Sequence, residues 1–273
     1  MTVRKAAPEE QGAVRSLWHS VFSDSPAEID RITHALDLGS RCFFIPEDGG
    51  AAAMAHWYGS GSLVFPDGRT LSAGVLYAVA SAPDARGRGF GAAVSRAAWT
   101  DMAQNGTGAR LTVPADAGLF DYYRRTLDAR TAFHVRELHL TGRDCGVRPR
   151  QIDAAEYGVF REAFLTDRVH LVFPSSVLRL QQDICERSGG GLFAFAGGCF
   201  SLERTADGAR ISELLCANVY VGLAAAASAA PGLSLTIRMP VQDPALSGVR
   251  PFAMADISLD TQPLPPWFGF AFD

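Results

Sequence analysis

The sequence lacks the features that would place it in a cysteine-stabilised, metal-binding or nucleic-acid-binding class. Its five cysteines are odd in number and include no CxxC pair, which argues against a disulfide framework and against a cysteine metal or redox site. There is no excess of basic residues, because the formal net charge is -4. We therefore predict reduced structural cysteines, no metal site and no nucleic-acid partner.

The chain also lacks a long hydrophobic run. Its most apolar stretch, residues 219–233, is rich in alanine and interrupted by Ser228 and Pro231, so it falls short of the roughly 20 apolar residues that span a bilayer. The first residues, MTVRKAAPEEQ, are polar and do not resemble a secretory signal peptide. We therefore expect a cytoplasmic protein without a membrane partner.

The apolar residues that are present follow the periods of alternating strands and helices. In the first half, strands are expected at 2–5, 41–45, 51–58, 71–81, 109–113 and 131–140. Helices are expected from Pro8, from Pro26 with Ser25 as its cap, at 92–103 and at 117–129. One helix links two central strands in this order, which predicts a mixed α/β sheet flanked by helices.

A polar segment with glycine and proline, residues 141–150, predicts a domain boundary. Beyond it, helices are expected at 154–164, after Pro174 and at 220–230, and strands at 191–195, 197–204, 209–216 and 233–239. The order of elements is similar to that of the first half. We therefore predict two related α/β domains, residues 1–143 and residues 147–273.

The sequence RGRGFG, residues 86–91, is the most informative stretch because it follows a predicted strand and opens a predicted helix. Glycines at alternate positions let the backbone turn with its N–H groups toward a ligand. The helix behind them adds the positive end of its dipole. Together with Arg86 and Arg88, these features predict a site for a pyrophosphate.

Three other interpretations of this loop compete with this one. A dinucleotide-binding loop has its first glycine at the end of the strand and an acidic residue closing the next strand. Here residues 83–86 intervene, and Asp116 follows the next strand only after Pro114 and Ala115. A P-loop requires Gly-Lys-Ser/Thr, which is absent. A turn that only caps the helix leaves the two arginines unexplained.

Residues 76–91, LYAVASAPDARGRGFG, resemble the central motif of the GNAT acetyltransferases. That motif is a strand followed by Arg or Gln, two residues, Gly, one residue, and Gly or Ala; Arg86, Gly89 and Gly91 match it. Residues 116–125, DAGLFDYYRR, resemble the family's next helix with its Phe/Tyr-Tyr pair.

Directly after this helix the family usually has Leu-Gly-Phe, where this chain has residues 126–128, Thr-Leu-Asp. The resemblance covers roughly the first 140 residues. The whole chain resembles tandem GNAT proteins, in which a degenerate second copy follows the first.

The resemblance implies the acyl-CoA N-acyltransferase fold in two GNAT-like halves, with acetyl-CoA as co-substrate. It places the pantetheine arm along a strand end and the pyrophosphate on the glycine loop. The residues that it assigns to the cofactor are Val79, Ala80, Ser81, Arg86, Gly87, Arg88, Gly89, Phe90 and Gly91.

The resemblance also implies an N-acetyltransferase in which a primary amine attacks the thioester directly, without a covalent enzyme intermediate. Tyr123 matches the position of the general acid that protonates the leaving thiolate. The general base stays open between His56, a chain of water molecules and the C-terminal carboxylate of Asp273. We expect a small-molecule or peptide amine as the acceptor, and a homodimer is one possible assembly.

Two other functions are compatible with the sequence. One is a non-catalytic sensor that binds acyl-CoA, and the other is a scaffold whose two halves only pack together. Binding of acetyl-CoA would exclude the scaffold, and catalysis would exclude the sensor.

Overall fold

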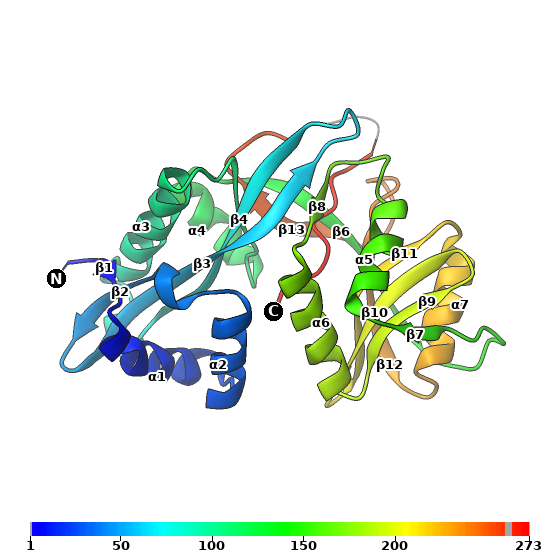
Figure 1. Cartoon of the computed structure of the whole chain (residues 1–273), viewed down its shortest axis with the longest axis horizontal. Coiled ribbons are helices and arrows are strands. Elements are labelled where there is room, and N and C mark those ends of the chain that lie inside the picture. The colour runs from blue at the N-terminus through cyan, green and yellow to red at the C-terminus, as the bar shows by residue number, and fades with distance from the viewer. Residues whose placement is uncertain (1, 260–263, 273) are drawn as a thin grey trace. The chain divides into compact units, whose positions relative to one another are not determined.

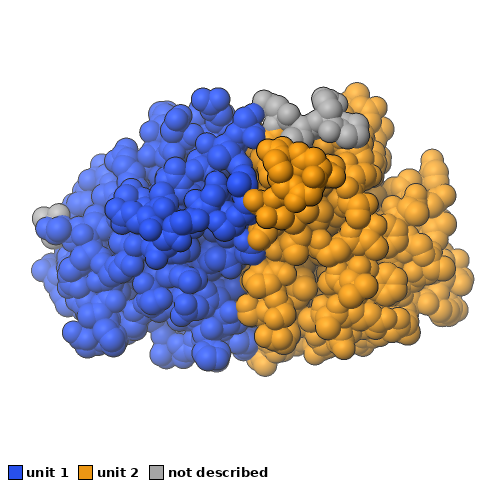
Figure 2. Space-filling model, turned by 45° about the horizontal axis from the view of Figure 1, so that its top comes forward, with its two compact units in different colours: residues 1–61, 71–130, 254–258 blue, residues 62–70, 131–253, 259–273 orange. Residues whose placement is uncertain are grey.

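The computed structural model describes residues 2–259 and 264–272. The chain divides into two units that alternate along the sequence (Figures 1 and 2). The first unit contains Met1–Gly61, Leu71–Arg130 and Met254–Ser258, and the second contains Ser62–Thr70, Thr131–Ala253 and Leu259–Asp273. The domain limits expected from the sequence, 1–143 and 147–273, stay a prediction.

The first unit contains a mixed sheet with the strand order β1-β2-β3-β4-β5-β13. Its strands are β1 (Arg4–Lys5), β2 (Cys42–Glu47), β3 (Gly50–Val64), β4 (Thr70–Ser81), β5 (Ala109–Thr112) and the end of β13 (Val249–Ala255). Residues 62–64 of β3, Thr70 of β4 and residues 249–253 of β13 belong to the second unit. Its α-helices are α1 (Gln11–Phe22), α2 (Pro26–Ala35), α3 (Phe90–Gln104) and α4 (Ala117–Leu127). The strands β4 and β5 are parallel, with α3 as the connecting helix. The mixed α/β sheet flanked by helices that the sequence predicted is therefore confirmed.

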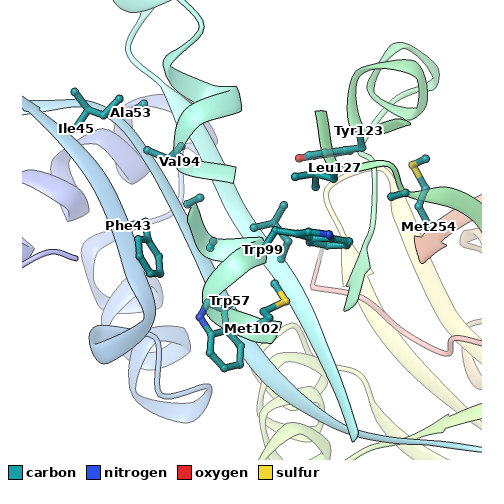
Figure 3. Close-up of a cluster of buried hydrophobic side chains, with 14 of the residues drawn as sticks. Phe43, Ile45, Ala53, Trp57, Val94, Trp99, Met102, Tyr123, Leu127 and Met254 are labelled. Atoms are coloured by element: carbon teal, nitrogen blue, oxygen red, sulfur yellow. The ribbon is translucent and has the colours of Figure 1, made fainter. Parts of the chain in front are cut away.

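Helices cover both faces of this sheet because side chains alternate along β2 and β3. Phe43 and Trp57 face the core cluster formed with α3 and α4 (Figure 3). His56, the next residue along β3 before Trp57, instead contacts Trp18 of α1. The helices α1 and α2 therefore lie on one face, and α3 and α4 on the other.

The start of α2 follows the predicted capping box. Ser25 Oγ accepts a hydrogen bond from the amide of Glu28, and the Glu28 carboxylate accepts one from the amide of Ser25. This reciprocal pair satisfies two amides at the helix start. It fixes the point at which the chain turns from α1 into α2.

The second unit has the strand order β6-β12-β11-β10-β9-β7. Its strands are β6 (Arg130–Thr141), whose first residue belongs to the first unit, β7 (Arg150–Ile152), β8 (His170–Val172), β9 (Gly191–Phe195), β10 (Gly198–Thr205), β11 (Gly208–Cys216) and β12 (Ser234–Pro240). Its helices are α5 (Ala154–Ala163), α6 (Ser175–Arg187) and α7 (Val219–Ala229). The strands β11 and β12 are parallel across α7, so this unit also has a parallel strand pair joined by one helix.

A buried carboxylate holds a distant segment in the core of the second unit. Glu213 of β11 is fully buried and accepts hydrogen bonds from Tyr157 Oη at 2.9 Å, from Arg161 Nε at 3.0 Å and from Trp267 Nε1 at 2.6 Å. Arg161 also donates to the carbonyl of Leu171. The residues that follow Trp267, including Phe268 and Phe270, are fully buried as well. The segment 267–270 is therefore part of this core.

Three strands were not predicted from the sequence. The strands β7 and β8 have three residues each, which is too short for a periodic pattern. The third, β13, contains Pro251, and proline argues against a strand interior. None of the described helices is both long and apolar enough to cross a lipid bilayer.

Candidate functional site

The two central strands of the first unit separate near their carboxyl ends. The parallel pairing of β4 with β5 runs from Ala73 opposite Ala109 to Leu76 opposite Thr112. There β5 ends, whereas β4 continues to Ser81. Among the described residues, the β5 side of residues 78–81 therefore has no strand partner, and such an edge is a template for hydrogen bonds to a ligand.

Within this edge, Ala78 has a left-handed backbone conformation, with φ of 47°. The other described non-glycine residues with positive φ lie in turns or directly after helices, namely Ser23, Asp37, Asp48 and Asp128. Alanine adopts this conformation at a cost of roughly 1–2 kcal/mol. This conformation could not be predicted from the sequence, because alanine is not a residue that favours positive φ.

The glycine loop joins this edge to α3. Gly87 and Gly89 have φ of 76° and 78°, so both positions favour glycine for conformational reasons. Gly89 is the N-cap of α3 and provides no side-chain cap. Since the first amides of a helix have no partner within the helix, this end of α3 has the donors and the dipole that bind an anion.

Gly91 is needed for a different reason, which is the close approach of its neighbours. A Cβ atom at this position would lie 3.1 Å from Ser81 Oγ and 3.2 Å from Tyr122 Oη. The first turn of α3 therefore packs directly against the end of β4 and against α4. The predicted cofactor residues at the strand end and on the loop thus form one continuous surface.

The two arginines of the loop differ in their surroundings. Arg88 forms an ion pair with Glu47, with Nη1 at 2.9 Å from Oε1, and its guanidinium lies 4.4 Å from the centroid of the Phe90 ring. Arg86 is exposed and has no ion-pair partner among the described residues. Arg86 therefore has the freer charge for an anion, while the charge of Arg88 is partly offset by Glu47.

Tyr123 lies at the point where β4 and β5 separate. Its side chain is 6% exposed and forms a hydrogen bond with the side chain of Thr112, the last residue of β5. Burial raises the pKa of the Tyr123 phenol above its usual value, so the hydroxyl keeps its proton at neutral pH. Tyr123 and Leu127 lie side by side on α4 (Figure 3). The sequence did not single out Thr112, although its place before Pro114 at a strand end was a usable signal.

Tyr122 is the less buried of the two tyrosines. Its ring contacts that of Tyr123 edge to face at 5.1 Å, and its hydroxyl forms hydrogen bonds with Ser95 and Thr126. Burial raises the pKa of Tyr122 as well. Tyr123 is a buried member of the core cluster, whereas Tyr122 is partly buried and packs against that cluster.

The structure describes one of the two side chains or termini considered as the general base, His56, and not the other, Asp273. His56 is 1% exposed, and burial lowers its pKa to about 4. It is therefore a neutral imidazole away from solvent at neutral pH. Asp273 lies outside the described residues. Asp116, which a dinucleotide site would require as a ribose ligand, instead accepts hydrogen bonds from the amides of Gly118 and Leu119 as the cap of α4.

No group of three or more His, Cys, Asp or Glu side chains within the described residues is arranged to hold a metal ion. The groups that this surface presents are backbone amides, the exposed guanidinium of Arg86 and the protonated phenol of Tyr123.

Comparison with known proteins gives a family match for the part of the chain that contains these features. Residues 2–126 match the family model of the acetyltransferase (GNAT) domain. No curated protein sequence matches the chain.

Solved structures match over nearly the whole chain. A GCN5-related N-acetyltransferase from Kribbella flavida superposes with a TM-score of 0.69 at 15% identity, over 93% of this chain and 70% of that one. Eis1 from Mycobacterium abscessus gives 0.68 at 15% identity, over 94% and 74%. A GCN5-related N-acetyltransferase from Sphaerobacter thermophilus gives 0.56 at 12% identity, over 93% of both chains.

At these identities the structures show the shared fold, and the family model assigns the first 126 residues. The unpaired end of β4, the glycine loop and the uncapped start of α3 all lie within that matched region. Residues 2–126 therefore match a GNAT acetyltransferase domain, the chain as a whole shares the fold of the GNAT structures, and the domain match supports an acyltransferase enzyme.

Proposed function

We propose that this protein is an N-acetyltransferase that moves the acetyl group of acetyl-CoA to a primary amine by direct attack. One observation carries the proposal: the edge of β4 leads through residues 82–85 into the glycine loop and into the N-terminus of α3, which has no side-chain cap. A thioester arm and a pyrophosphate are the two parts of acetyl-CoA that such a surface can bind together.

In this proposal the pantetheine arm lies along Val79, Ala80 and Ser81, where it takes the place of the missing β5 partner. The pyrophosphate lies on residues 87–91 and is attracted by Arg86. Each hydrogen bond from a backbone amide to the charged phosphate contributes about 1.5–3 kcal/mol. The amides also polarise the thioester carbonyl, and this stabilises the negative charge that develops on its oxygen.

Tyr123 has the role of general acid toward the leaving thiolate. The step requires a proton on the phenol at neutral pH, which a tyrosine carries at its ordinary pKa of about 10 and keeps when burial raises that pKa. The tyrosinate left by the transfer regains a proton from water. The hydrogen bond with Thr112 orients the hydroxyl at the end of β5. Attack of the amine forms the C–N bond as the C–S bond breaks, and the proton of Tyr123 goes to the sulfur.

The acceptor enters as a neutral amine. His56 is a poor base for an alkylammonium ion, because its pKa of about 4 lies far below the amine's value of about 10. We therefore assign proton removal from the amine to water and give His56 no proton-transfer role. The acceptor class in this proposal is a primary amine on a small molecule or a peptide.

The test begins with calorimetric titration of acetyl-CoA into the full chain, with NAD as the control ligand. We expect binding of acetyl-CoA and none of NAD. Gly89→Val should abolish that binding, because valine disfavours φ of 78° and the loop amides would turn away from the phosphate. If acetyl-CoA does not bind to the unaltered protein, the glycine loop is only a structural turn and the proposal fails.

A second measurement separates an enzyme from an acyl-CoA sensor. A panel of primary amines is screened for thiol release from acetyl-CoA, and Tyr123→Phe is compared with the unaltered protein on the best acceptor. We expect kcat to fall by about 10²- to 10⁴-fold, the usual contribution of acid–base catalysis, with acetyl-CoA affinity unchanged. Binding without turnover on any amine would favour the sensor instead.

A further inference from the structure

His56 is a buried polar residue for which the proposed chemistry has no use. It lies on the α1 and α2 face of β3, with its ring 5.2 Å from that of Trp18. The same ring lines a pocket of about 190 Å³ between these helices, together with Thr33 and Ile29. The ring is therefore bordered by Trp18 on one side and by this pocket on another.

The ring is tied to the neighbouring strand by a hydrogen bond. The amide of Ala82 donates to the carbonyl of Ala52 across β3 and β4. Because the strands are antiparallel, four residues forward from Ala52 lie opposite four residues back from Ala82. His56 is therefore opposite Ala78. His56 forms a hydrogen bond with the backbone of Ala78 that favours the protonated ring, so the Ala78 carbonyl is the acceptor. His56 Nδ1 has no hydrogen-bond partner, which leaves Nε2–H as the donor.

Ala78 is also the residue whose left-handed φ turns the peptide that follows it. The carbonyl of Ala78 and the amide of Val79 belong to one planar trans peptide group, so they point in opposite directions. A carbonyl held toward His56, on the α1 and α2 face, directs the Val79 N–H toward the other face. That face carries α3, and Val79 itself packs against the α3 and α4 core.

We propose that His56 is a positioning residue: it holds the Ala78 carbonyl and thereby aims the Val79 amide at the oxygen of the bound thioester. This inference rests on the proposed function, because the thioester is the group that the amide would polarise. It also accounts for alanine in a left-handed conformation within a strand, since the hydrogen bond offsets part of the steric cost.

The first test compares two substitutions at His56. Gln carries an amide N–H at about the reach of Nε2, whereas Leu fills the space without a donor. We expect His56→Leu to lower kcat by about 10- to 100-fold, part of the effect of losing an oxyanion donor, with KM for acetyl-CoA unchanged. His56→Gln should restore most of the rate. Equal losses in both variants would overturn the proposal.

The second test couples His56 to the residue that it holds. Glycine adopts positive φ without steric cost, so the turned peptide should depend less on His56 in an Ala78→Gly protein. We expect His56→Leu to cost markedly less kcat in that background than in the unaltered one. The same fold-loss in both backgrounds would mean that the two residues act independently, and the proposal would be wrong.

A control separates positioning from loss of stability. Met102→Ala removes a fully buried side chain from α3 in the same unit but does not touch Ala78 in its strand. Both Met102→Ala and His56→Leu should lower the melting temperature, and only His56→Leu should lower kcat at a temperature where both are folded. A comparable kcat loss in Met102→Ala would assign the effect of His56 to stability.

A readout without catalysis keeps this inference separate from the proposed function. In ¹⁵N–¹H spectra of the protein without ligand, His56→Leu should shift the Val79 amide resonance, and His56→Gln should leave it near its original position. If no amine is acetylated but this pattern is observed, the proposed function fails while the positioning contact stands. If the Val79 resonance is the same in all three proteins, the positioning contact itself is wrong.

Discussion

The chain contains two parallel strand pairs, each connected by one helix. The two pairs differ in whether the backbone hydrogen-bonding groups beside them are already used within the chain. In the first unit β4 and β5 are joined through α3, and in the second β11 and β12 are joined through α7. The connection before α3 comprises residues 82–89, whereas α7 follows β11 after residues 217 and 218 alone. Only the longer connection has room for a loop that surrounds a ligand.

The two helix starts differ accordingly. The N-cap of α3 is Gly89, which has no side chain to offer. The N-cap of α7 is Asn218, whose Oδ1 accepts hydrogen bonds from the amides of Tyr220 at 2.9 Å and Val221 at 3.3 Å. The backbone amides at the start of α3 are therefore available to an anion. The corresponding amides at the start of α7 are already bonded to a side chain of the same unit.

The strand edges differ in the same way. The pairing of β11 with β12 ends at Ile211 opposite Ile237, and β11 continues to Cys216. Beyond that point Glu213 is engaged by Tyr157, Arg161 and Trp267. A parallel pair that separates is thus not by itself a binding site. We propose that the second copy binds no acyl-CoA, because its own side chains satisfy the groups that a ligand would meet.

The largest effect is expected from removal of the buried negative charge of Glu213 in the second unit. Glu213→Gln leaves Arg161, which is 1% exposed, without its buried partner. Breaking a buried ion pair from one side costs about 3–5 kcal/mol. We expect a loss of that size in urea unfolding followed by circular dichroism.

The matched control is an exposed ion pair in the same unit. Asp144 and Arg148 are paired at 2.7 Å with both side chains largely exposed, and exposed pairs contribute little. Asp144→Asn should leave the unfolding midpoint unchanged. Equal effects of the two substitutions would show that Glu213 does not hold the core as described.

The first unit contains a buried neutral imidazole, that of His56. We expect the free energy of unfolding to fall in acid because of this group. The folded pKa of His56, about 4, lies below its unfolded value of 6.5, so the unfolded state binds more protons between these values. Stability is therefore fully present above pH 6.5 and is lost as the pH falls toward 4. At pH 5 the loss from this group is about 2 kcal/mol.

The measurement is the urea midpoint of the unaltered protein and of His56→Gln at pH 7 and pH 5. Gln does not titrate, so the difference between the two pH values should be smaller in the variant. If the variant loses as much stability as the unaltered protein, other groups are responsible for the acid sensitivity.

The smallest expected effect concerns the capped helix start. Asn218→Ala removes the side-chain acceptor from the first amides of α7, and loss of such a cap costs about 1 kcal/mol. Acetyl-CoA affinity measured by calorimetry should be unchanged, in contrast to Gly89→Val. A weakened affinity for acetyl-CoA in Asn218→Ala would contradict the assignment of cofactor binding to the first unit.

The parts of the first unit that the sequence could predict were those with local signals. The glycine loop, the strand before it and the helix after it were visible because Gly89 and Arg86 are residue types tied to backbone conformation and charge. Ser25 was recognised as a cap for the same reason. The left-handed conformation of Ala78 was not visible, since it depends on the neighbouring strand and not on the alanine itself.

The burial of Glu213 could not be predicted either. A glutamate in a strand is ordinarily expected on an exposed face, and the partners that make its burial tolerable are distant in sequence. Arg161 lies on α5 and Trp267 lies near the end of the chain. Contacts between residues so far apart in the sequence produce no periodic pattern. The pattern of residues 209–216 therefore predicted the strand β11 but not the burial of Glu213 on it.

The late position of two segments also constrains the order of events during synthesis. Met254 and Ala255 pair with β5 in the first unit, and Trp267 donates to Glu213 in the second. Domains ordinarily fold as they emerge, the N-terminal one first. Here neither unit can complete its sheet or its core until residues 254–270 have been translated. Both units therefore depend on segments that are translated after most of their other elements.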